Sequence, residues 1–287
     1  MYSYKINKLP KKTIELLLDI PKDDIKKEYK LAFSKLQSEL TVEGFRKGKV
    51  PSAIAEKHLS KNDIYQELLK SLLSRLYEEI IKKENIVPVI NPKIDLIKAK
   101  ENEDWQIKIT IAERPVITIG NYKATIKKVK EAKKKDIIWV PGKDNKEKKP
   151  DEDKQKLLND ILSALMQEAK IEISDMIIDE ELNQRLTRLV DDIQKIGLTT
   201  ESYLKSKNLT MEDLKNRYKR EIEDTYKMEF LIMELADKEN IKVEKEELDK
   251  LLSNIKDDKE RQSAMQNSYF YASILRKQKT IDMLLNL

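Results

Sequence analysis

The sequence predicts an α+β N-terminal domain followed by an elongated all-α C-terminal domain. Its 287 residues suffice for two domains that each bury a core of their own. Only 5 glycines and 8 prolines are present, which leaves few turns for an all-β architecture. Apolar residues recur at helical spacing over most of the second half. We therefore expect domains at residues 1–120 and 157–287, joined by a lysine-rich connector at 121–156.

The N-terminal part is expected to begin with extended chain and to continue with helices. Residues 2–20 read as extended, and Pro21 precedes a helix at about residues 22–40. A second helical region starts at Pro51 and carries an apolar stripe at helical spacing. The stripe consists of Ile64, Leu68, Leu72, Leu76 and Ile80.

Two strands are expected after these helices, at residues 87–99 and 105–112. In the second segment every other residue is apolar, which predicts one buried face. The alternating residues are Trp105, Ile107, Ile109 and Ile111. Together these elements describe a small α+β domain. Residues 116–126 either extend its sheet or leave it as an arm.

The connector at 121–156 has two interpretations. Its lysines and the Pro141-Gly142 pair are typical of a solvated linker. Its one apolar run is Ile137-Ile138-Trp139-Val140, and the alternative is that this Trp139 segment docks on one of the domains.

From residue 157 onward the pattern is helical. We expect Gly197 to end one helix, Thr210 and Asp213 to begin another as a near capping box, and residues 241–243 to form a short break. The last helix is expected to carry Met265, Tyr269, Ala272, Leu275 and Ile281. Methionines concentrate in residues 157–287, which contain seven of the 8. They either adapt to varied apolar partners or fill gaps in the helical core.

Composition argues against several kinds of site. Without cysteine the chain forms neither disulfides nor thiolate metal centres. The single histidine, His58, is expected on the polar side of a helix, so a His-based metal site or catalytic triad is not predicted. No apolar run is long enough for a signal core or a membrane span, which favours a soluble cytoplasmic protein with no membrane partner. We predict no cofactor, no metal and no catalytic residue.

Charge is unevenly distributed along the chain. Residues 1–120 carry 23 Lys and Arg against 18 Asp and Glu, and residues 121–156 carry 13 against 7. Residues 157–287 reverse the balance, with 21 against 27. This asymmetry indicates that the basic front of the chain docks on a polyanion, from which the acidic end is repelled.

The most informative stretch is a short glycine-bracketed loop. It consists of Gly44, Phe45, Arg46, Lys47, Gly48, Lys49, Val50 and Pro51. The two glycines permit positive φ, and Pro51 suits the first turn of a helix. It is not a phosphate-binding P-loop, because three residues separate the glycines and Val50 follows Lys49. We expect an exposed tip that presents Phe45 and its neighbouring cations to an anionic partner.

The string Gly-Phe-Arg-x-Gly-x-x-Pro in this setting resembles the signature of trigger factor, the bacterial ribosome-associated chaperone family. Residues 87–94 resemble the family's strand after the second helix, and residues 113–122 resemble its exit from the N-terminal domain. Residues 157–287 resemble its helical C-terminal domain, including the turn at Tyr203-Leu204 and the joint at 241–243. The resemblance therefore covers nearly all of the chain.

The resemblance implies an ATP-independent chaperone, a holdase that docks at the exit tunnel of the large ribosomal subunit. The loop residues Gly44 to Lys49 and Pro51 would contact tunnel-rim protein and ribosomal RNA, with Phe45, Arg46 and Lys47 at the contact. The C-terminal helices would form the cradle for unfolded nascent polypeptides. Off the ribosome, the oligomeric state stays open between a monomer and a homodimer.

The sequence departs from the family in two respects. One is at Ser174-Asp175, where the family tends to have a proline near the start of the helix; the other is a missing domain. The family usually carries a prolyl-isomerase domain between the two parts, whereas here only residues 121–156 occupy that place. We therefore predict that the protein is not an enzyme. Two alternatives stay open: a prolyl isomerase as in the full-length family, and a periplasmic-type holdase that shares the helical fold. A nucleic-acid-binding module is a third, suggested by the basic front.

Overall fold

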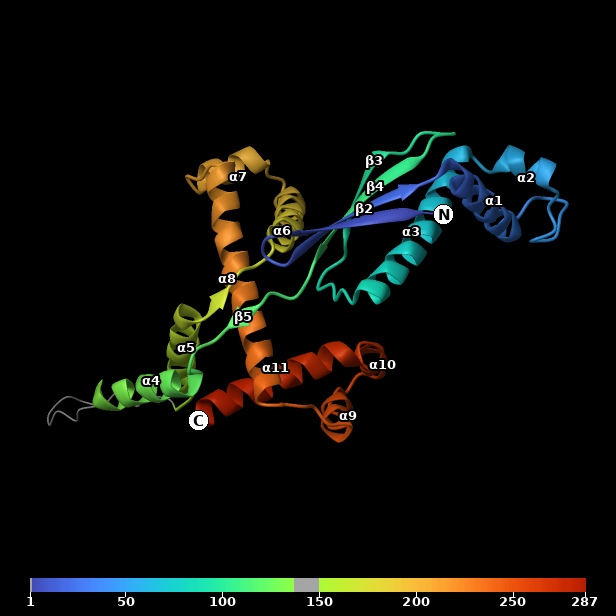
Figure 1. The fold of residues 1–287 in the computed structure, drawn as a ribbon. Coiled ribbons are helices and arrows are strands. Elements are labelled where there is room, and N and C mark those ends of the chain that lie inside the picture. The colour runs from blue at the N-terminus through green and yellow to red at the C-terminus, as the bar shows by residue number, and fades with distance from the viewer. Residues whose placement is uncertain (1, 137–149) are drawn as a thin grey trace. The chain divides into compact units, whose positions relative to one another are not determined.

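The computed structural model describes residues 2–136 and 150–287, and it divides into two compact units (Figure 1). Unit 1 comprises Met1–Arg114 together with Ser174–Ile177, and unit 2 comprises Pro115–Ile173 and Ile178–Leu287. Unit 1 combines a sheet with helices, and unit 2 is mainly helical. The predicted fold class is therefore confirmed.

A four-stranded antiparallel sheet forms the centre of unit 1. In spatial order its strands are β1 (Ser3–Leu9), β2 (Thr13–Ile20), β4 (Trp105–Ala112) and β3 (Lys93–Lys98). The alternation in β4 was read correctly from the sequence, since its four apolar residues are at most 3% exposed. Leu16 and Leu18 of β2 lie opposite Ile109 and Ile107, so the two strands share one buried face.

The strand predicted at 87–99 is shorter in the structure. β3 covers only Lys93–Lys98, and before it Pro88 forms an isolated bridge with Glu113. Pro88 and Pro92 lack the backbone N–H that a continuous ladder requires, which explains the late start of the strand.

Three helices complete unit 1, and two of them cover the buried face of the sheet. They are α1 (Lys22–Glu39), α2 (Ser52–His58) and α3 (Lys61–Glu84). Ile25 and Ala32 of α1 join the predicted stripe of α3 in a single core cluster with β2 and β4. The helical region from Pro51 is interrupted at Ser60, where the Ser60 hydroxyl accepts from the Asp63 N–H (3.1 Å) and so caps α3.

Unit 2 is built mainly from helices, with one two-stranded ribbon. Its elements are β5 (Ile117–Thr118), α4 (Tyr122–Asp136), α5 (Pro150–Glu168), β6 (Lys170–Ile171), α6 (Asp175–Lys195), α7 (Thr200–Ser206), α8 (Met211–Lys238), α9 (Lys245–Ser253), α10 (Asp258–Gln266) and α11 (Ser268–Asn286). Helices α5, α8 and α11 pack on one another and bury Ile161, Leu165, Leu231, Leu235 and Leu284.

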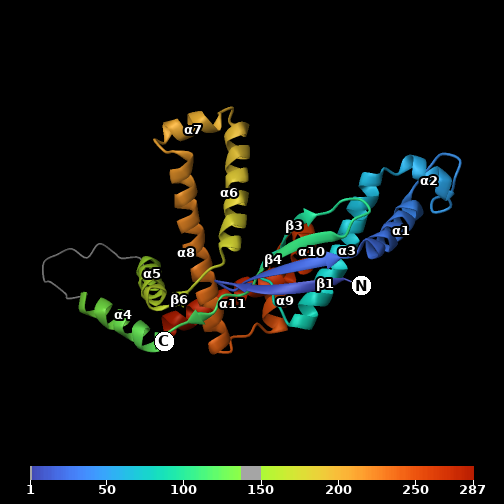
Figure 2. The ribbon, with the colours of Figure 1, turned by 45° about the horizontal axis from the view of Figure 1, so that its top comes forward.

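Helices α6 and α8 lie side by side and are joined through α7 (Figure 2). The Lys219 ammonium of α8 pairs with the Asp179 carboxylate of α6 at 2.9 Å. The predicted helix ends here are confirmed: Gly197 has φ +74°, and Thr210 forms a reciprocal capping box with Asp213.

One expectation for the C-terminal helices was wrong. The last helix is divided into α10 and α11 at Asn267, whose side chain donates to the Ser263 carbonyl at 2.9 Å and competes with helix continuation. Tyr269 lies on α11 as expected, and it is 87% exposed.

The connector also differs from the expectation. The boundary between the units falls at Arg114 and Pro115 rather than at 120, and Tyr122–Asp136 forms helix α4. β5 pairs with β6, so this segment leaves the main sheet as an arm. Ile126 of α4 is 1% exposed, which shows an apolar face that the many lysines concealed. The run Ile137-Ile138-Trp139-Val140 lies outside the described residues.

Candidate functional site

The glycine-bracketed loop connects α1 to α2 in unit 1. Phe45, Arg46, Lys47 and Lys49 are all exposed, with Phe45 at 39% of its full accessible surface. The structure therefore brings the predicted residues together at one surface loop. An exposed aromatic ring beside cations is a common arrangement at binding surfaces.

Two successive turns shape the tip of this loop. The Phe45 N–H donates to the Val42 carbonyl at 3.0 Å, and the Lys49 N–H donates to the Arg46 carbonyl at 2.9 Å. Gly44 and Gly48 have φ values of +85° and +75°, a region that residues with a Cβ adopt at a cost. Both glycines are therefore needed for this backbone path.

The base of the loop is held against the end of α1. Val50 is 2% exposed, and the Gln37 amide donates to its carbonyl at 2.7 Å. A Cβ at position 48 would approach the Ser38 carbonyl oxygen to 3.2 Å, whereas one at position 44 would meet nothing within 4 Å. The tip thus stands on a packed base, with Gly48 in close contact with α1.

The loop offers charge to a partner. Within the described residues, no ion pair engages Arg46, Lys47 or Lys49, and Glu43 is the one acidic residue next to the loop. A free guanidinium can donate two parallel hydrogen bonds to a phosphate or a carboxylate. Pro51 precedes α2 as its N-cap residue, and its carbonyl accepts from the Ile54 and Ala55 N–H groups at 3.0 Å.

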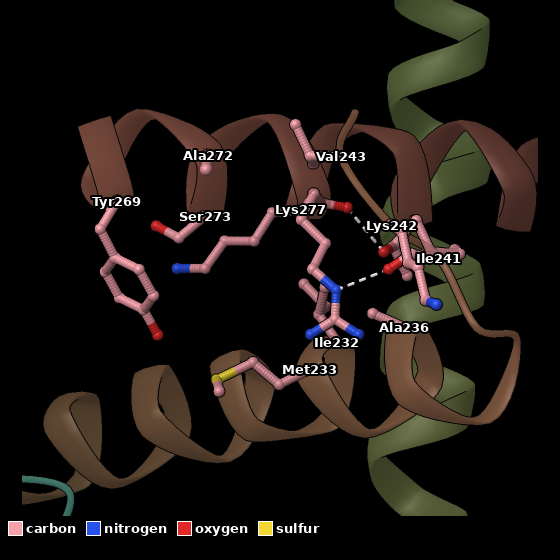
Figure 3. Close-up of a pocket in the computed structure, with 12 residues that line it drawn as sticks. Ile232, Met233, Ala236, Ile241, Lys242, Val243, Tyr269, Ala272, Ser273 and Lys277 are labelled. Atoms are coloured by element: carbon pink, nitrogen blue, oxygen red, sulfur yellow. Dashed lines mark hydrogen bonds between the residues drawn. The ribbon is translucent and has the colours of Figure 1, made fainter. Parts of the chain in front are cut away.

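A second candidate site is an apolar groove in unit 2 with a volume of about 580 Å³ (Figure 3). Ile232, Met233 and Ala236 of α8 form one wall, and α11 with the 241–243 segment forms the other. Figure 3 shows Tyr269 at one end of the groove, on the helix that faces Met233. The groove therefore has an apolar wall on α8, basic side chains such as Lys277 on the α11 side, and the exposed Tyr269 at one end.

Basic residues of α11 fix the 241–243 segment in place. The Arg276 guanidinium donates to the Ile241 carbonyl at 2.8 Å and to the Asp237 carboxylate at 2.6 Å. The Lys279 ammonium donates to the Lys242 carbonyl at 2.8 Å and pairs with Glu247. The hydrogen bond from Lys279 lowers the pKa of the Glu247 carboxyl, with a further contribution from the Glu244 N–H. These contacts define the groove wall before any ligand binds.

Tyr269 was expected only as one of the residues on the last helix, and its position at a groove was not predicted. A signal was present in Tyr269-Phe270-Tyr271, since three consecutive helical residues point in directions about 100° apart and cannot all face one core. Tyr269 and Phe270 are 87% and 60% exposed. Of the methionines, Met233 lines this groove, whereas Met166 and Met228 line a second one of about 460 Å³ between α5 and α8.

Other kinds of site receive no support from residues 2–136 and 150–287. No group of three or more His, Asp or Glu side chains there is arranged to hold a metal ion. None of the described helices has both the length and the apolar character needed to cross a bilayer. His58 is exposed at the end of α2, as its position in the sequence predicts.

Family comparisons cover both parts of the chain. A family model described as "Bacterial trigger factor protein (TF)" matches residues 2–138, and one described as "Bacterial trigger factor protein (TF) C-terminus" matches residues 142–286. Only residues 139–141 lie between the two matches. Three residues are far too few for an inserted folded domain.

Individual relatives that match shorter segments of this chain carry the same family name. The trigger factor of Desulfotalea psychrophila is 33% identical over 119 residues, which are 42% of this chain and 27% of that protein. The trigger factor of Lactococcus lactis subsp. cremoris is 33% identical over 108 residues, which are 38% of this chain and 25% of that protein. The matched segments thus span about a quarter of these relatives.

A solved structure shares the fold of the whole chain. It is described as "Promiscuous Substrate Recognition in Folding and Assembly Activities of the Trigger Factor Chaperone". The two chains superpose with a TM-score of 0.60 over 98% of this chain and 99% of the other, at 14% sequence identity. At this identity the likeness concerns the fold alone.

Proposed function

This chain belongs to the trigger factor family, and we propose that it is a cytoplasmic, ribosome-associated molecular chaperone that acts without ATP. In this proposal unit 1 docks at the exit tunnel of the large ribosomal subunit through the 44–51 loop. Unit 2 then holds unfolded nascent polypeptides in apolar grooves on its helices. The proposal is supported by family membership, by the exposed loop and by the groove between α8 and α11.

The observation that carries the docking step is the exposure of Phe45 and Arg46 on a packed loop base. The ribosome surface presents RNA phosphates and acidic protein side chains, both of which suit a bidentate guanidinium. Phe45 adds apolar contact that a purely electrostatic surface lacks. Because Val50 and Gln37 hold the loop base, little conformational entropy is lost on docking.

Ribosome co-sedimentation of the F45A/R46A/K47A variant tests this step. We expect its binding to fall to background while its circular dichroism spectrum and melting stay unchanged, because exposed substitutions rarely affect stability much. A matched control is K26A/K30A/L31A, which removes two cations and one apolar side chain from exposed positions of α1. Loss of binding in the control but not in the loop variant would contradict the proposal.

The holding step rests on the chemistry of the α8–α11 groove. Met233 offers a polarizable side chain that adjusts to different apolar partners, and Tyr269 offers a large amphipathic ring. Such a surface suits clients that share exposed apolar residues but no common sequence. The sequence contains no G-x-x-x-x-G-K-[ST] string to couple nucleotide binding to release, which is the basis for proposing action without ATP.

We also propose that the protein is not a prolyl isomerase. The family models for the two terminal parts nearly meet at residues 139–141, so a domain of ordinary size is not inserted between them. Holding and isomerisation are separable in a proline-limited refolding assay, because isomerisation takes tens of seconds or longer without catalysis.

A further inference from the structure

The outer edge of β3 in unit 1 is open. β3 is the last strand in the sheet order β1-β2-β4-β3, and it pairs on one side with β4 (Figure 1). Within residues 2–136 and 150–287, no backbone hydrogen bond joins Lys93–Lys98 to a segment other than β4. An edge strand of this kind presents a row of unpaired N–H and C=O groups. β3 can therefore offer a further chain the hydrogen bonds of a fifth strand.

Apolar side chains lie along this edge on the core face of the sheet. Ile94 and Leu96 of β3 lie opposite Ile109 and Ile107 of β4, and both β4 residues are 0% exposed. Helices α1 and α3 cover this face over β2 and β4, yet Ile94 and Leu96 stay 43% and 47% exposed. The helices thus leave a strip of apolar surface uncovered beside the open backbone edge.

The other border of the sheet, at β1, is different. Tyr4 and Ile6 of β1 are half-buried and pack against the core cluster. The Tyr4 hydroxyl donates to the Glu84 carboxylate of α3 at 2.6 Å, and the Lys83 ammonium lies 5.2 Å from the centre of the Tyr4 ring. Side chains of α3 therefore cover the core face at this border, so β1 has no comparable free apolar strip.

We propose that the β3 edge binds, as a fifth strand, an extended segment of an unfolded polypeptide in which every second side chain is apolar. Backbone hydrogen bonds would hold such a segment, and the apolar side chains on one of its faces would pack beside Ile94 and Leu96. That the occupant is a client rests on the proposed holding function. The site itself is separate from the α8–α11 groove, which belongs to unit 2.

Two features of β3 keep this binding short and reversible. Lys93 and Lys98 stand at the ends of the strand, and the register with β4 shifts between Leu96 and Lys98, which marks a β-bulge. Charged ends and bulges restrict uncontrolled pairing at the sheet edges of natural proteins. Regular pairing is thus confined to Lys93–Leu96, a length that suits transient holding rather than aggregation.

A second copy of the chain fits this edge less well. The antiparallel register that matches Ile94 of each copy with Leu96 of the other places the two Asp95 carboxylates opposite each other. Like charges directly opposite one another on neighbouring strands are destabilising. A client segment with a neutral or basic residue at that position avoids this repulsion.

Hydrogen exchange of the full chain with a synthetic peptide tests the proposal. The probe is a heptapeptide with valine at alternate positions and threonine or lysine between them, and the control probe carries N-methyl groups on its two central amides. We expect the probe to slow exchange in residues 93–98 but not in residues 3–9. The control probe should slow neither, because N-methylation removes donors that a ladder requires. The M233E/Y269A variant, altered only in unit 2, should show the same protection of β3, which separates this result from any failure of the groove.

A pair of substitutions measures the apolar contribution. I94T/L96T keeps strand-forming residues but removes most of the apolar surface, and its matched control L9T/L31Q replaces two exposed leucines of unit 1 outside β3. Fluorescence anisotropy should show about tenfold weaker peptide binding by I94T/L96T, at about threefold for each lost cross-strand pair. The control variant should bind within about twofold of wild type.

Protection confined to α8 and α11, or equal protection by the N-methylated probe, would overturn the proposal. Equal weakening in both variants, with melting curves that match wild type, would overturn it as well. If I94T/L96T melts earlier than wild type, the comparison of the two probes on the wild-type chain decides. Slower exchange in residues 93–98 that needs no peptide and grows with protein concentration would assign the edge to a second copy instead.

Discussion

Alanine and asparagine substitutions at the two loop glycines should separate backbone conformation from steric crowding. Gly44 and Gly48 both have positive φ, at +85° and +75°, but only Gly48 lies close to other atoms. An L-residue in this region costs roughly 1–2 kcal/mol relative to glycine. If this path of the loop is the docking conformation, G44A should lower the fraction of protein that is competent to dock by about 5- to 30-fold, and the apparent ribosome affinity should fall by the same factor.

Asparagine provides the discriminating comparison. It adopts positive φ more readily than alanine, so G44N should recover most of the affinity that G44A loses, because nothing lies within 4 Å of the added Cβ. G48N should not recover, since its Cβ would still meet the Ser38 carbonyl oxygen at 3.2 Å. The assay is titration of fluorescently labelled protein with purified ribosomes, with circular dichroism as the control for folding.

Equal recovery of G44N and G48N would refute the reasoning about Ser38 and show that the base of the loop relaxes easily. Wild-type affinity for G44A and G48A alike would refute the larger claim, because docking would then not depend on the loop conformation seen here. The comparison needs no assumption about which ribosomal atoms the loop contacts.

Two further predictions concern the proposed activities. The M233E/Y269A variant should bind an unfolded model client about tenfold more weakly in an aggregation-suppression titration, because an aromatic side chain that a bound client buries contributes about 1.5–3 kcal/mol. The control L31A, at a residue that is 63% exposed in unit 1, should bind the client normally. Equal weakening in both variants would show that the groove is not the client site. In a peptide assay, the purified protein should leave the rate of cis-to-trans prolyl isomerisation at its uncatalysed value; acceleration that persists after contaminating isomerases are removed would disprove the non-enzymatic assignment.

Predictions from the sequence were most accurate for elements in which a single hydrophobic periodicity accounts for which residues are buried. The alternation from Trp105 to Ile111 and the stripe from Ile64 to Ile80 both describe elements with a single buried face, and both are buried as expected. The helix boundaries at Gly197 and Thr210 were also predictable, because capping depends on residues close in sequence. The exposed loop at 44–51 follows from the same local rules, since glycine φ is a local property.

Prediction failed where contacts between distant segments decide the structure. Helix α4 was taken as a linker because its lysines dominate the composition. In the structure Ile126 is buried, and the ammonium groups of Lys130 and Lys133 bind the Leu285 carbonyl and the Asp160 carboxylate within unit 2. β6 is two residues long and exists because Ile171 pairs with Ile117 far earlier in the chain. The α8–α11 groove depends on Arg276 binding the Ile241 carbonyl, a contact across 35 positions that no window of sequence reveals.

The chemistry of the two proposed sites is suited to opposite tasks. Docking on one fixed ribosomal surface favours a loop that is ordered before it binds, and the Gln37 hydrogen bond to the Val50 carbonyl and the two turn hydrogen bonds at Phe45 and Lys49 restrain this one. Holding many different clients favours an adaptable surface, and Met233 with the exposed Tyr269 provides that in a groove whose walls are fixed by Arg276 and Lys279. The charges fit the same proposed division, because residues 157–287 carry 27 acidic against 21 basic side chains. In the proposed docked state this excess of carboxylates would repel RNA from the groove-bearing helices. Reversing that balance with lysines around the groove would therefore be expected to impair holding on ribosomes more than holding in their absence.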